Sequence, residues 1–259
     1  MKSTLGAAIM AGATFLAVAG PVTAQSCSPA ISNENLVEPG KLMLSINPTN
    51  PPQRLCMQIE LVRMDFPAMI PAMNAGRIDG LNTGMFWNEE RSKLMFTVPY
   101  SQQSISVAVL PDSDARLAGD QDLLGHSSAV EVNSYQMAWL KNFSDAAAAE
   151  GESTVQIRSF PTASNVVAAL RAKQVDNAVL VDSVARDLVR RGQIKEALSG
   201  LGKTRATLAF RNKAVADAFV VALNDMRKDG SYAALFKNFN LTPLGQDEPL
   251  EIAGSGPAQ

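Results

Sequence analysis

Residues 62–100 read VRMDFPAMIPAMNAGRIDGLNTGMFWNEERSKLMFTVPY, and this stretch decides the predicted fold. It opens with a helix signal, because Asp65 is a suitable N-terminal cap and Pro67 suits a first helical turn, where a missing N–H costs least. Apolar residues at helical spacing follow, until Gly76 offers a C-terminal stop. The pattern therefore predicts a helix between Asp65 and Gly76.

The second half of the stretch combines a strand, a turn and the start of another helix. Residues 77–82 resemble a short strand, and residues 83–84 (Thr-Gly) have the composition of a turn. Asn88 is a strong N-terminal cap, and the acids that follow it suit the helix dipole. Arg91 would lie beside free backbone N–H groups, so the motif predicts an anion clamp. A surface arginine paired with a neighbouring glutamate is the alternative.

The run from Ile70 to Tyr100 resembles the signature of the family 3 solute-binding proteins, the periplasmic amino-acid receptors of ABC importers. The positions that match the family pattern are Ile70, Pro71, Ala72, Gly76, Arg77, Asp79, Gly84, Met85, Arg91, Phe96, Thr97, Pro99 and Tyr100. Weaker resemblance extends from Leu36 to Asn240. The resemblance implies an α/β protein with the two-lobed, type II periplasmic binding protein fold and mostly parallel sheets. It also implies that two strands join the lobes, which close on a ligand by a hinge motion.

Composition excludes some classes of function. The chain has 259 residues and a formal net charge of −2, so it lacks the basic footprint of a nucleic-acid-binding protein. Residues 1–24 contain Lys2, an uncharged run of small and apolar residues and a cleavage site at Val22-Thr23-Ala24, which predicts a signal peptide and a periplasmic location. A membrane anchor is the alternative, although the Gly- and Ala-rich run argues against it. No later segment is long and apolar enough to span a bilayer.

Residues for catalysis or metal binding are sparse. The single histidine, His126, stands among Gly and Ser with no acid at useful spacing. The sequence has no His/Cys metal cluster, no Gly-x-Ser-x-Gly elbow and no phosphate-binding loop. Cys27 and Cys56 could pair in an oxidising compartment or remain free. We therefore expect a monomer with no metal, no cofactor and no enzymatic activity.

Beyond Tyr100 the chain alternates strands and helices. Residues 104–110 predict a strand that crosses to a second lobe, and the alternation after it favours a mostly parallel sheet. Helices are predicted at 135–149, 162–171, 182–191, 212–228 and 232–239. The expected division is a first part of lobe one at 25–104, lobe two at 105–206, a return to lobe one at 207–241 and a disordered tail at 242–259.

The first lobe departs from the family pattern after Pro52. Relatives continue with a hairpin, a Gly-Phe-x-x-Asp segment and a helix, whereas this chain passes from Gln53 directly to residues that resemble the tail of that helix. Strands at 42–46 and 59–63, if they are parallel neighbours, need a crossover of about a dozen residues, usually a helix. We therefore expect lobe one to lack a helix, to expose an apolar sheet face and to lose stability.

The resemblance assigns ligand-binding roles to the first lobe. Arg91 would grip the ligand α-carboxylate with two parallel hydrogen bonds, and Gly84 would offer backbone groups to the ligand. Phe86 stands where relatives often have a small hydroxyl residue. Phe86 and Trp87 would either form an apolar wall for the ligand side chain or pack in the core.

Further candidates come from the second lobe and from the loop after the first strand. Asn133 and Ser134 match the start of a helix where relatives bind the other carboxylate oxygen, and the same residues can cap that helix. Asp182 ends a strand where relatives place the acid that accepts the ligand ammonium, although the spacing is one residue longer. Asn47 and Asn50 would form a wall of the cleft, or only a turn.

These observations predict an extracytoplasmic receptor for a small amino acid that docks on the permease of an ABC transporter. Two alternatives remain open. Some periplasmic enzymes share the fold, such as cyclohexadienyl or arogenate dehydratases, and Glu131 or an Asp in the cleft could act as the acid. A sensor that has lost ligand binding through the gap near Gln53 is the other. The neutral Asn47 and the aromatic residues 86–87 favour a ligand with an uncharged side chain.

Overall fold

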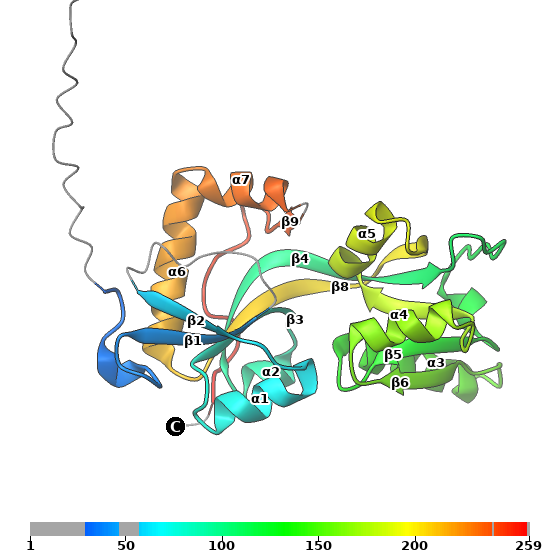
Figure 1. Cartoon of the computed structure of the whole chain (residues 1–259), viewed down its shortest axis with the longest axis horizontal. Coiled ribbons are helices and arrows are strands. Elements are labelled where there is room, and N and C mark those ends of the chain that lie inside the picture. The colour runs from blue at the N-terminus through cyan, green and yellow to red at the C-terminus, as the bar shows by residue number, and fades with distance from the viewer. Residues whose placement is uncertain (1–28, 47–56, 240, 258–259) are drawn as a thin grey trace, which may run out of the picture.

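The computed structural model describes residues 29–46, 57–239 and 241–257 (Figure 1). The sequence predictions that lie outside these ranges concern the signal peptide (1–24), Asn47, Asn50, the pairing of Cys27 with Cys56 and the gap near Gln53.

The helices in the described ranges are η1 (Asn33–Asn35), α1 (Phe66–Asn74), α2 (Glu89–Ser92), η3 (Asp120–Leu123), α3 (Tyr135–Ala149), α4 (Ala163–Arg171), α5 (Asp182–Arg190), α6 (Lys213–Lys228) and α7 (Ser231–Asn238). The strands are β1 (Lys41–Ile46), β2 (Gln58–Val62), β3 (Gly80–Phe86), β4 (Phe96–Val109), β5 (Ser127–Glu131), β6 (Gln156–Phe160), β7 (Asn177–Val181), β8 (Lys195–Phe210) and β9 (Thr242–Pro243). None of these helices combines the length and the hydropathy needed to cross a bilayer.

Two groups of elements are joined by the long strands β4 and β8 (Figure 1). We call the group with β1, β2, β3, α1, α2, α6 and α7 lobe one, and the group with β5, β6, β7, α3, α4 and α5 lobe two. A nine-stranded sheet runs through both lobes in the order β2-β1-β3-β8-β4-β7-β5-β6, with β9 beside β4. The predicted two-lobed α/β fold is confirmed.

The sheet is parallel at its two ends and antiparallel at its centre. In lobe one β1 pairs in parallel with β2 and β3, and in lobe two β5 pairs in parallel with β6 and β7. The joining strands β4 and β8 are antiparallel to each other and to their neighbours β7 and β3. The antiparallel centre arises because one joining strand leaves lobe one and the other returns to it.

Local capping signals place the helices of the second half of the chain. Ser134, Thr162 and Asn212 precede α3, α4 and α6, and each side chain accepts a hydrogen bond from a backbone N–H of the following turn. These bonds satisfy donors that a helix start leaves without an intrahelical partner. The helices predicted from these caps are therefore confirmed to within one or two residues.

Two helices cover opposite faces of the lobe-one sheet. Leu42 and Leu44 of β1 pack in one cluster with Phe219 of α6, whereas Met43 between them packs in a second cluster with Met69 of α1. Successive side chains of a strand point to opposite faces, so α6 and α1 lie on the two sides of the sheet. Lobe one therefore has a helix on each face.

The joining strands are longer than the sequence predicted. The sequence predicts a strand at 104–110 and, where the chain returns to lobe one, a short strand at 208–210. They are the ends of β4, which has 14 residues, and β8, which has 16. Polar residues interrupt the alternation of both segments, so the pattern alone does not reveal their length. The two strands pair with each other from Phe96 to Val109, with several register shifts, and this pairing extends them.

β2 is the edge strand of the sheet in lobe one, the lobe that was expected to lack a helix and to expose an apolar sheet face. Leu61 of β2 is 48% exposed. Because the connection between β1 and β2 lies outside the described ranges, the loss of a helix there stays a prediction.

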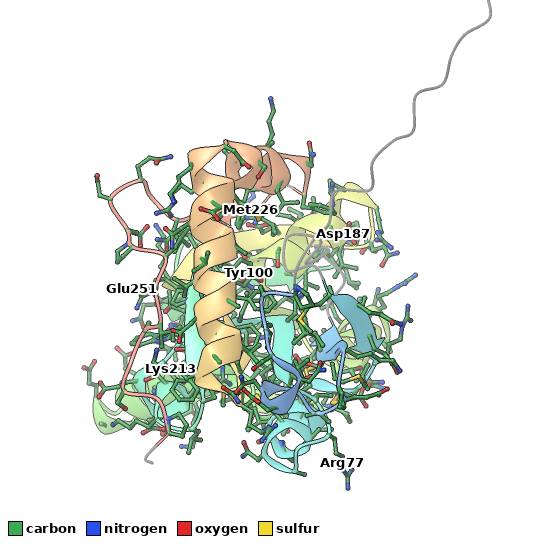
Figure 2. The ribbon with its side chains drawn as sticks, turned by 90° about the vertical axis from the view of Figure 1, so that its left-hand side faces the viewer. Arg77, Tyr100, Asp187, Lys213, Met226 and Glu251 are labelled. Carbon is green, nitrogen blue, oxygen red and sulfur yellow. The ribbon has the colours of Figure 1, made fainter. Side chains whose placement is uncertain are left out.

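The expectation of a disordered tail at 242–259 is wrong for the part that the structure describes. β9 pairs with β4, and Leu244 and Leu250 are buried in a cluster with Tyr232 and Phe236 of α7. Figure 2 shows the segment around Glu251 running beside α6. The composition predicted disorder because the apolar surface that holds this segment forms only when α7 packs on lobe one.

Candidate functional site

Arg91 lies in α2, a single turn that follows β3. The side chain of Asn88 accepts a hydrogen bond from the Arg91 N–H at 2.8 Å, as the cap signal predicted. Acids at positions 89 and 90 occupy the first turn of the helix, where the positive end of the helix dipole stabilises their negative charge. The local sequence thus places Arg91 at the end of a strand, directly beside lobe two.

The Arg91 guanidinium contacts both lobes. Its Nη1 donates to the Phe86 carbonyl at 2.9 Å, and its Nη2 donates to the Asn133 carbonyl of lobe two at 3.4 Å. The guanidinium carbon lies 5.5 Å from the centre of the Phe66 ring, which is a cation–π distance. Burial lowers the pKa of Arg91. Arg91 therefore lies between the lobes and not on an outer face.

Phe86 also joins the two lobes. Its ring stacks on Tyr135, the first residue of α3, with centroids 4.6 Å apart and planes 8° apart. Phe86 is 3% exposed and belongs to a cluster made mainly of residues from β4 and lobe two. Of the two alternatives for Phe86, a ligand wall or packing in the core, these contacts show packing between the lobes in this structure.

Trp87 has a different environment from its neighbour. Its indole N–H donates to Thr97 Oγ1 at 3.1 Å, and the Arg205 guanidinium lies 4.8 Å from its ring. Its backbone N–H donates to the Arg205 carbonyl at 2.8 Å. Of the two alternatives for Trp87, these contacts favour packing against β4 and β8 over a ligand wall.

Gly84 lies inside β3, so the turn predicted at residues 83–84 is wrong. The pairing of β3 with β8 shifts register between Leu81 and Met85, and Gly84 has a φ of 68° within this irregular stretch. A positive φ is costly for residues with a Cβ, which explains a glycine at this position. The stretch reads as a turn in sequence because a bulge needs the same residue type.

Asn133 and Ser134 form the turn from β5 into α3. Ser134 Oγ accepts a hydrogen bond from the Met137 N–H at 3.1 Å and donates to the Glu131 carbonyl at 2.6 Å. Asn133 has a φ of 57° and presents its carbonyl to Arg91. Ser134 therefore serves as the predicted cap, and the contact to Arg91 comes from the backbone of its neighbour.

Asp182 is a buried acid at the start of α5. Its Oδ2 accepts hydrogen bonds from Ser104 of β4 at 3.1 Å and from Arg186 Nη1 at 3.0 Å. Its Oδ1 is buried and has no hydrogen-bond partner among the described residues. A buried acceptor without a partner is costly, so Oδ1 is suited to accept a hydrogen bond from a ligand.

Glu131, the last residue of β5, has a perturbed pKa. Burial, with a smaller contribution from the negative charge of Asp65 in lobe one, raises the pKa of Glu131 to about 7, against a hydrogen bond from the Ala163 backbone that lowers it. Glu131 lies two residues before Asn133, whose carbonyl accepts a hydrogen bond from Arg91 of lobe one. A carboxyl with this pKa can hold or release a proton near neutral pH.

Two aromatic residues of the lobe interface were not predicted. Phe66 follows the cap of α1 and lies beside Arg91, and Tyr135 follows the cap of α3 and stacks on Phe86. Their position directly after a cap was the available signal. It was insufficient because caps mark helix starts and do not show which starts face each other.

A surface hollow of about 360 Å³ lies away from these residues. It is formed by β6 and α4 of lobe two and is lined by Phe160, Pro161, Asn165, Ala168, Ala169, Ala172 and Gln174. None of the predicted ligand residues within the described ranges lines it. In the part of the chain that the structure describes, no group of three or more His, Cys, Asp or Glu residues could hold a metal ion.

Comparison with known proteins gives consistent results. Residues 52–242 match the family described as bacterial extracellular solute-binding proteins, family 3. A probable histidine-binding protein of Campylobacter jejuni is 24% identical over 191 residues, which cover 71% of each chain. An ancestral arginine-binding protein bound to arginine superposes with a TM-score of 0.67 and 24% identity, covering 77% of this chain and 98% of the other. An ancestral amino acid-binding protein that preceded cyclohexadienyl dehydratase superposes with a TM-score of 0.66 and 19% identity, covering 77% and 95%.

Proposed function

Because the chain belongs to family 3 of the bacterial extracellular solute-binding proteins, we propose that it is a periplasmic receptor for a small amino acid. The amino acid binds between the lobes, which close about the strands β4 and β8, and the closed form docks on the permease of an ABC transporter. The proposal draws on the family and on relatives that bind histidine and arginine.

The observation that carries this proposal is the position of Arg91 between the lobes. Its guanidinium now donates to two backbone carbonyls, one from each side of the interface. A ligand carboxylate would replace these neutral acceptors with two charged oxygens, which an arginine can bind through two parallel hydrogen bonds. Phe66 would keep water from one face of the guanidinium. The clamp therefore favours an organic acid over neutral solutes.

The ligand ammonium is assigned to Asp182. Its Oδ1 is a buried carboxylate oxygen that lacks a partner within the described ranges, while Oδ2 accepts hydrogen bonds from Ser104 and Arg186. One positive charge on the ligand would complement this acid. Arg91 and Asp182 together select a zwitterion.

The ligand side chain is assigned to the aromatic residues of the interface. Phe86 and Tyr135 stack on each other, and Phe66 lies beside Arg91. Opening of the lobes would separate the Phe86–Tyr135 stack and expose two aromatic faces. Such faces pack well against planar or apolar groups.

Isothermal titration calorimetry with the twenty common amino acids tests the proposal. The wild-type protein should bind at least one of them, and Arg91→Ala should weaken that binding by at least 100-fold, about 3 kcal/mol. Arg77→Ala is the matched control, because Arg77 is exposed and points away from the chain in Figure 2. Equal affinity in the wild type and Arg91→Ala would remove Arg91 from the site, and no binding by the wild type would favour the ligand-free sensor.

A second candidate function is an enzyme of the dehydratase type on the same fold. Glu131 favours it, since a carboxyl with a pKa of about 7 can donate a proton at neutral pH. Incubation of the protein with arogenate, followed by measurement of its consumption, separates the two functions. Turnover that is lost in Glu131→Gln would support the enzyme, whereas stoichiometric binding without turnover would support the receptor.

A further inference from the structure

The segment after β9 returns along lobe one, and we call residues 244–257 the C-terminal strap. Its first half is held by α6: Asn224 Nδ2 donates to the Leu250 carbonyl at 2.8 Å, and Arg227 Nη1 donates to the Glu248 carbonyl at 2.7 Å. The Glu248 carboxylate accepts hydrogen bonds from Gln102 of β4. These bonds tie the strap to α6 and to the joining strand β4, and Figure 2 shows it beside α6.

The second half of the strap is bonded to the start of β4. The Ala253 N–H donates to the Thr97 carbonyl at 2.9 Å, and Thr97 Oγ1 donates to the Ala253 carbonyl at 2.6 Å. The same Thr97 hydroxyl accepts the indole N–H of Trp87 at 3.1 Å. A continuous chain of hydrogen bonds thus links the strap to the segment that connects β3 with α2.

Two glycines then bring the strap backbone against α2 and the start of β4. A Cβ on Gly254 would overlap the Cβ and Oγ of Ser92, and a Cβ on Gly256 would lie 2.6 Å from Phe96 Cε1. Both glycines have a positive φ, of 89° and 70°, which a residue with a Cβ adopts at a cost. The strap backbone therefore lies directly on Ser92, the neighbour of Arg91 in the sequence.

α2 needs outside support to keep its geometry. It has four residues. Isolated helices of this length are unstable, because forming the first turn fixes several residues for a single hydrogen bond. Within the turn, Ser92 Oγ donates to the Glu89 carbonyl at 2.7 Å and the Ser92 N–H donates to the Asn88 carbonyl at 3.1 Å. Contacts from another segment are needed to hold the turn where Arg91 reaches lobe two.

We propose that the C-terminal strap is a positioning element. It packs against Ser92 of α2, a contact that we call the brace, and so holds the Arg91 guanidinium at the interface between the lobes. The strap contacts Ser92, Thr97 and Phe96, and does not itself reach the ligand. Its effect on affinity rests on the proposed function, because it acts through Arg91 on the ligand carboxylate. Its effect on α2 does not depend on any ligand.

Hydrogen exchange with mass spectrometry, on peptides that cover residues 88–94, tests the brace without a ligand. In Gly254→Ala the new Cβ pushes the strap off Ser92, and exchange in this segment should become at least 10-fold faster. Gly151→Ala is the matched control, because Gly151 has a φ of 78° and no atom within 4 Å of the added Cβ. It carries a similar backbone cost and should change exchange in residues 88–94 by less than 2-fold.

Calorimetry with L-arginine and L-histidine then measures the consequence for binding. Gly254→Ala should weaken the affinity for whichever of the two binds by at least 10-fold. The control Gly151→Ala should leave this affinity unchanged, even if its thermal unfolding midpoint falls as much. Thr97→Val removes the hydroxyl that bonds both Ala253 and Trp87, with little change in shape, and Trp87→Phe removes only the indole donor. Faster exchange in Thr97→Val than in Trp87→Phe therefore decides the question if Gly254→Ala fails to fold.

The outcomes separate the brace from the proposed function. Faster exchange at residues 88–94 in Gly254→Ala, or in Thr97→Val than in Trp87→Phe, supports the brace, and unchanged exchange in the folded variants overturns it. If the wild type binds neither amino acid, the affinity is measured with whichever of the twenty common amino acids it binds, and binding of none overturns the proposed function. The exchange result decides the role of the strap in either case. Faster exchange with unchanged affinity would overturn the positioning of Arg91 by the strap.

Discussion

Replacing Glu131 by Gln should remove a pH-dependent loss of stability at the interface between the lobes. Burial and the charge of Asp65 raise the pKa of Glu131 from its ordinary value of 4.5 to about 7. The folded protein therefore favours the protonated carboxyl. Below pH 4.5 the carboxyl is protonated in the folded and unfolded states, and the contribution of Glu131 to the free energy of unfolding is fully present. That contribution is lost as the pH rises to about 7.

The size of the effect follows from the same pKa. Each pH unit between the two values is worth about 1.4 kcal/mol, so a rise from 4.5 to about 7 sets a ceiling of about 3 kcal/mol. Glu131 is only partly buried, and solvent screening lowers the expected value to about 2 kcal/mol. Glutamine has a similar shape, stays neutral and can still accept the hydrogen bond of Ala163.

Urea unfolding at pH 4.5 and pH 8 measures this difference. The free energy of unfolding of the wild type, relative to that of Glu131→Gln, should fall by about 2 kcal/mol between these conditions. Above pH 8 this difference between the two proteins should no longer change with pH. Glu150→Gln is the control, because Glu150 lies on the exposed end of α3 in the same lobe. A stability difference between the wild type and Glu131→Gln that does not change with pH would refute the reasoning.

Two further predictions concern single side chains. Arg186→Met leaves the Asp182 carboxylate buried without its cation, and urea unfolding at pH 7 should show a loss of about 2 kcal/mol; equal stability would show that the ion pair does not stabilise the fold. Tyr232→Phe removes hydrogen bonds to the Tyr100 carbonyl at 2.6 Å and from the Leu244 N–H at 3.0 Å. It should cost about 1–3 kcal/mol in urea unfolding, and a loss below 0.5 kcal/mol would show that water replaces the hydroxyl.

The helices were predictable because their signals are local. A cap such as Ser134 or Thr162 and the apolar spacing after it lie within a few residues of each other, so a short window contains the whole cause of the helix start. The same reasoning failed at Gly84, where a bulge and a turn require the same positive φ. The local sequence shows that the backbone departs from regular geometry there, and the partner strand β8 decides which departure occurs.

The long strands and the C-terminal strap were not predictable for the opposite reason. β4 and β8 stabilise each other although about a hundred residues separate them, and the strap depends on Thr97, which lies 156 residues before Ala253. Contacts at such separations leave no periodic trace in the segment itself. Polar composition then reads as a connector or as disorder, as it did for the tail at 242–259.

The candidate site divides in the same way. The sequence alone determined that Arg91 stands in the first turn of a helix after a strand, because the cap at Asn88 and the arginine lie three positions apart. Only the tertiary structure decided that Arg91 faces the Asn133 carbonyl and that the Phe66 ring lies beside it. The physical reason is that a cap fixes the start of a helix, whereas the sheet and the two joining strands fix what that helix start faces.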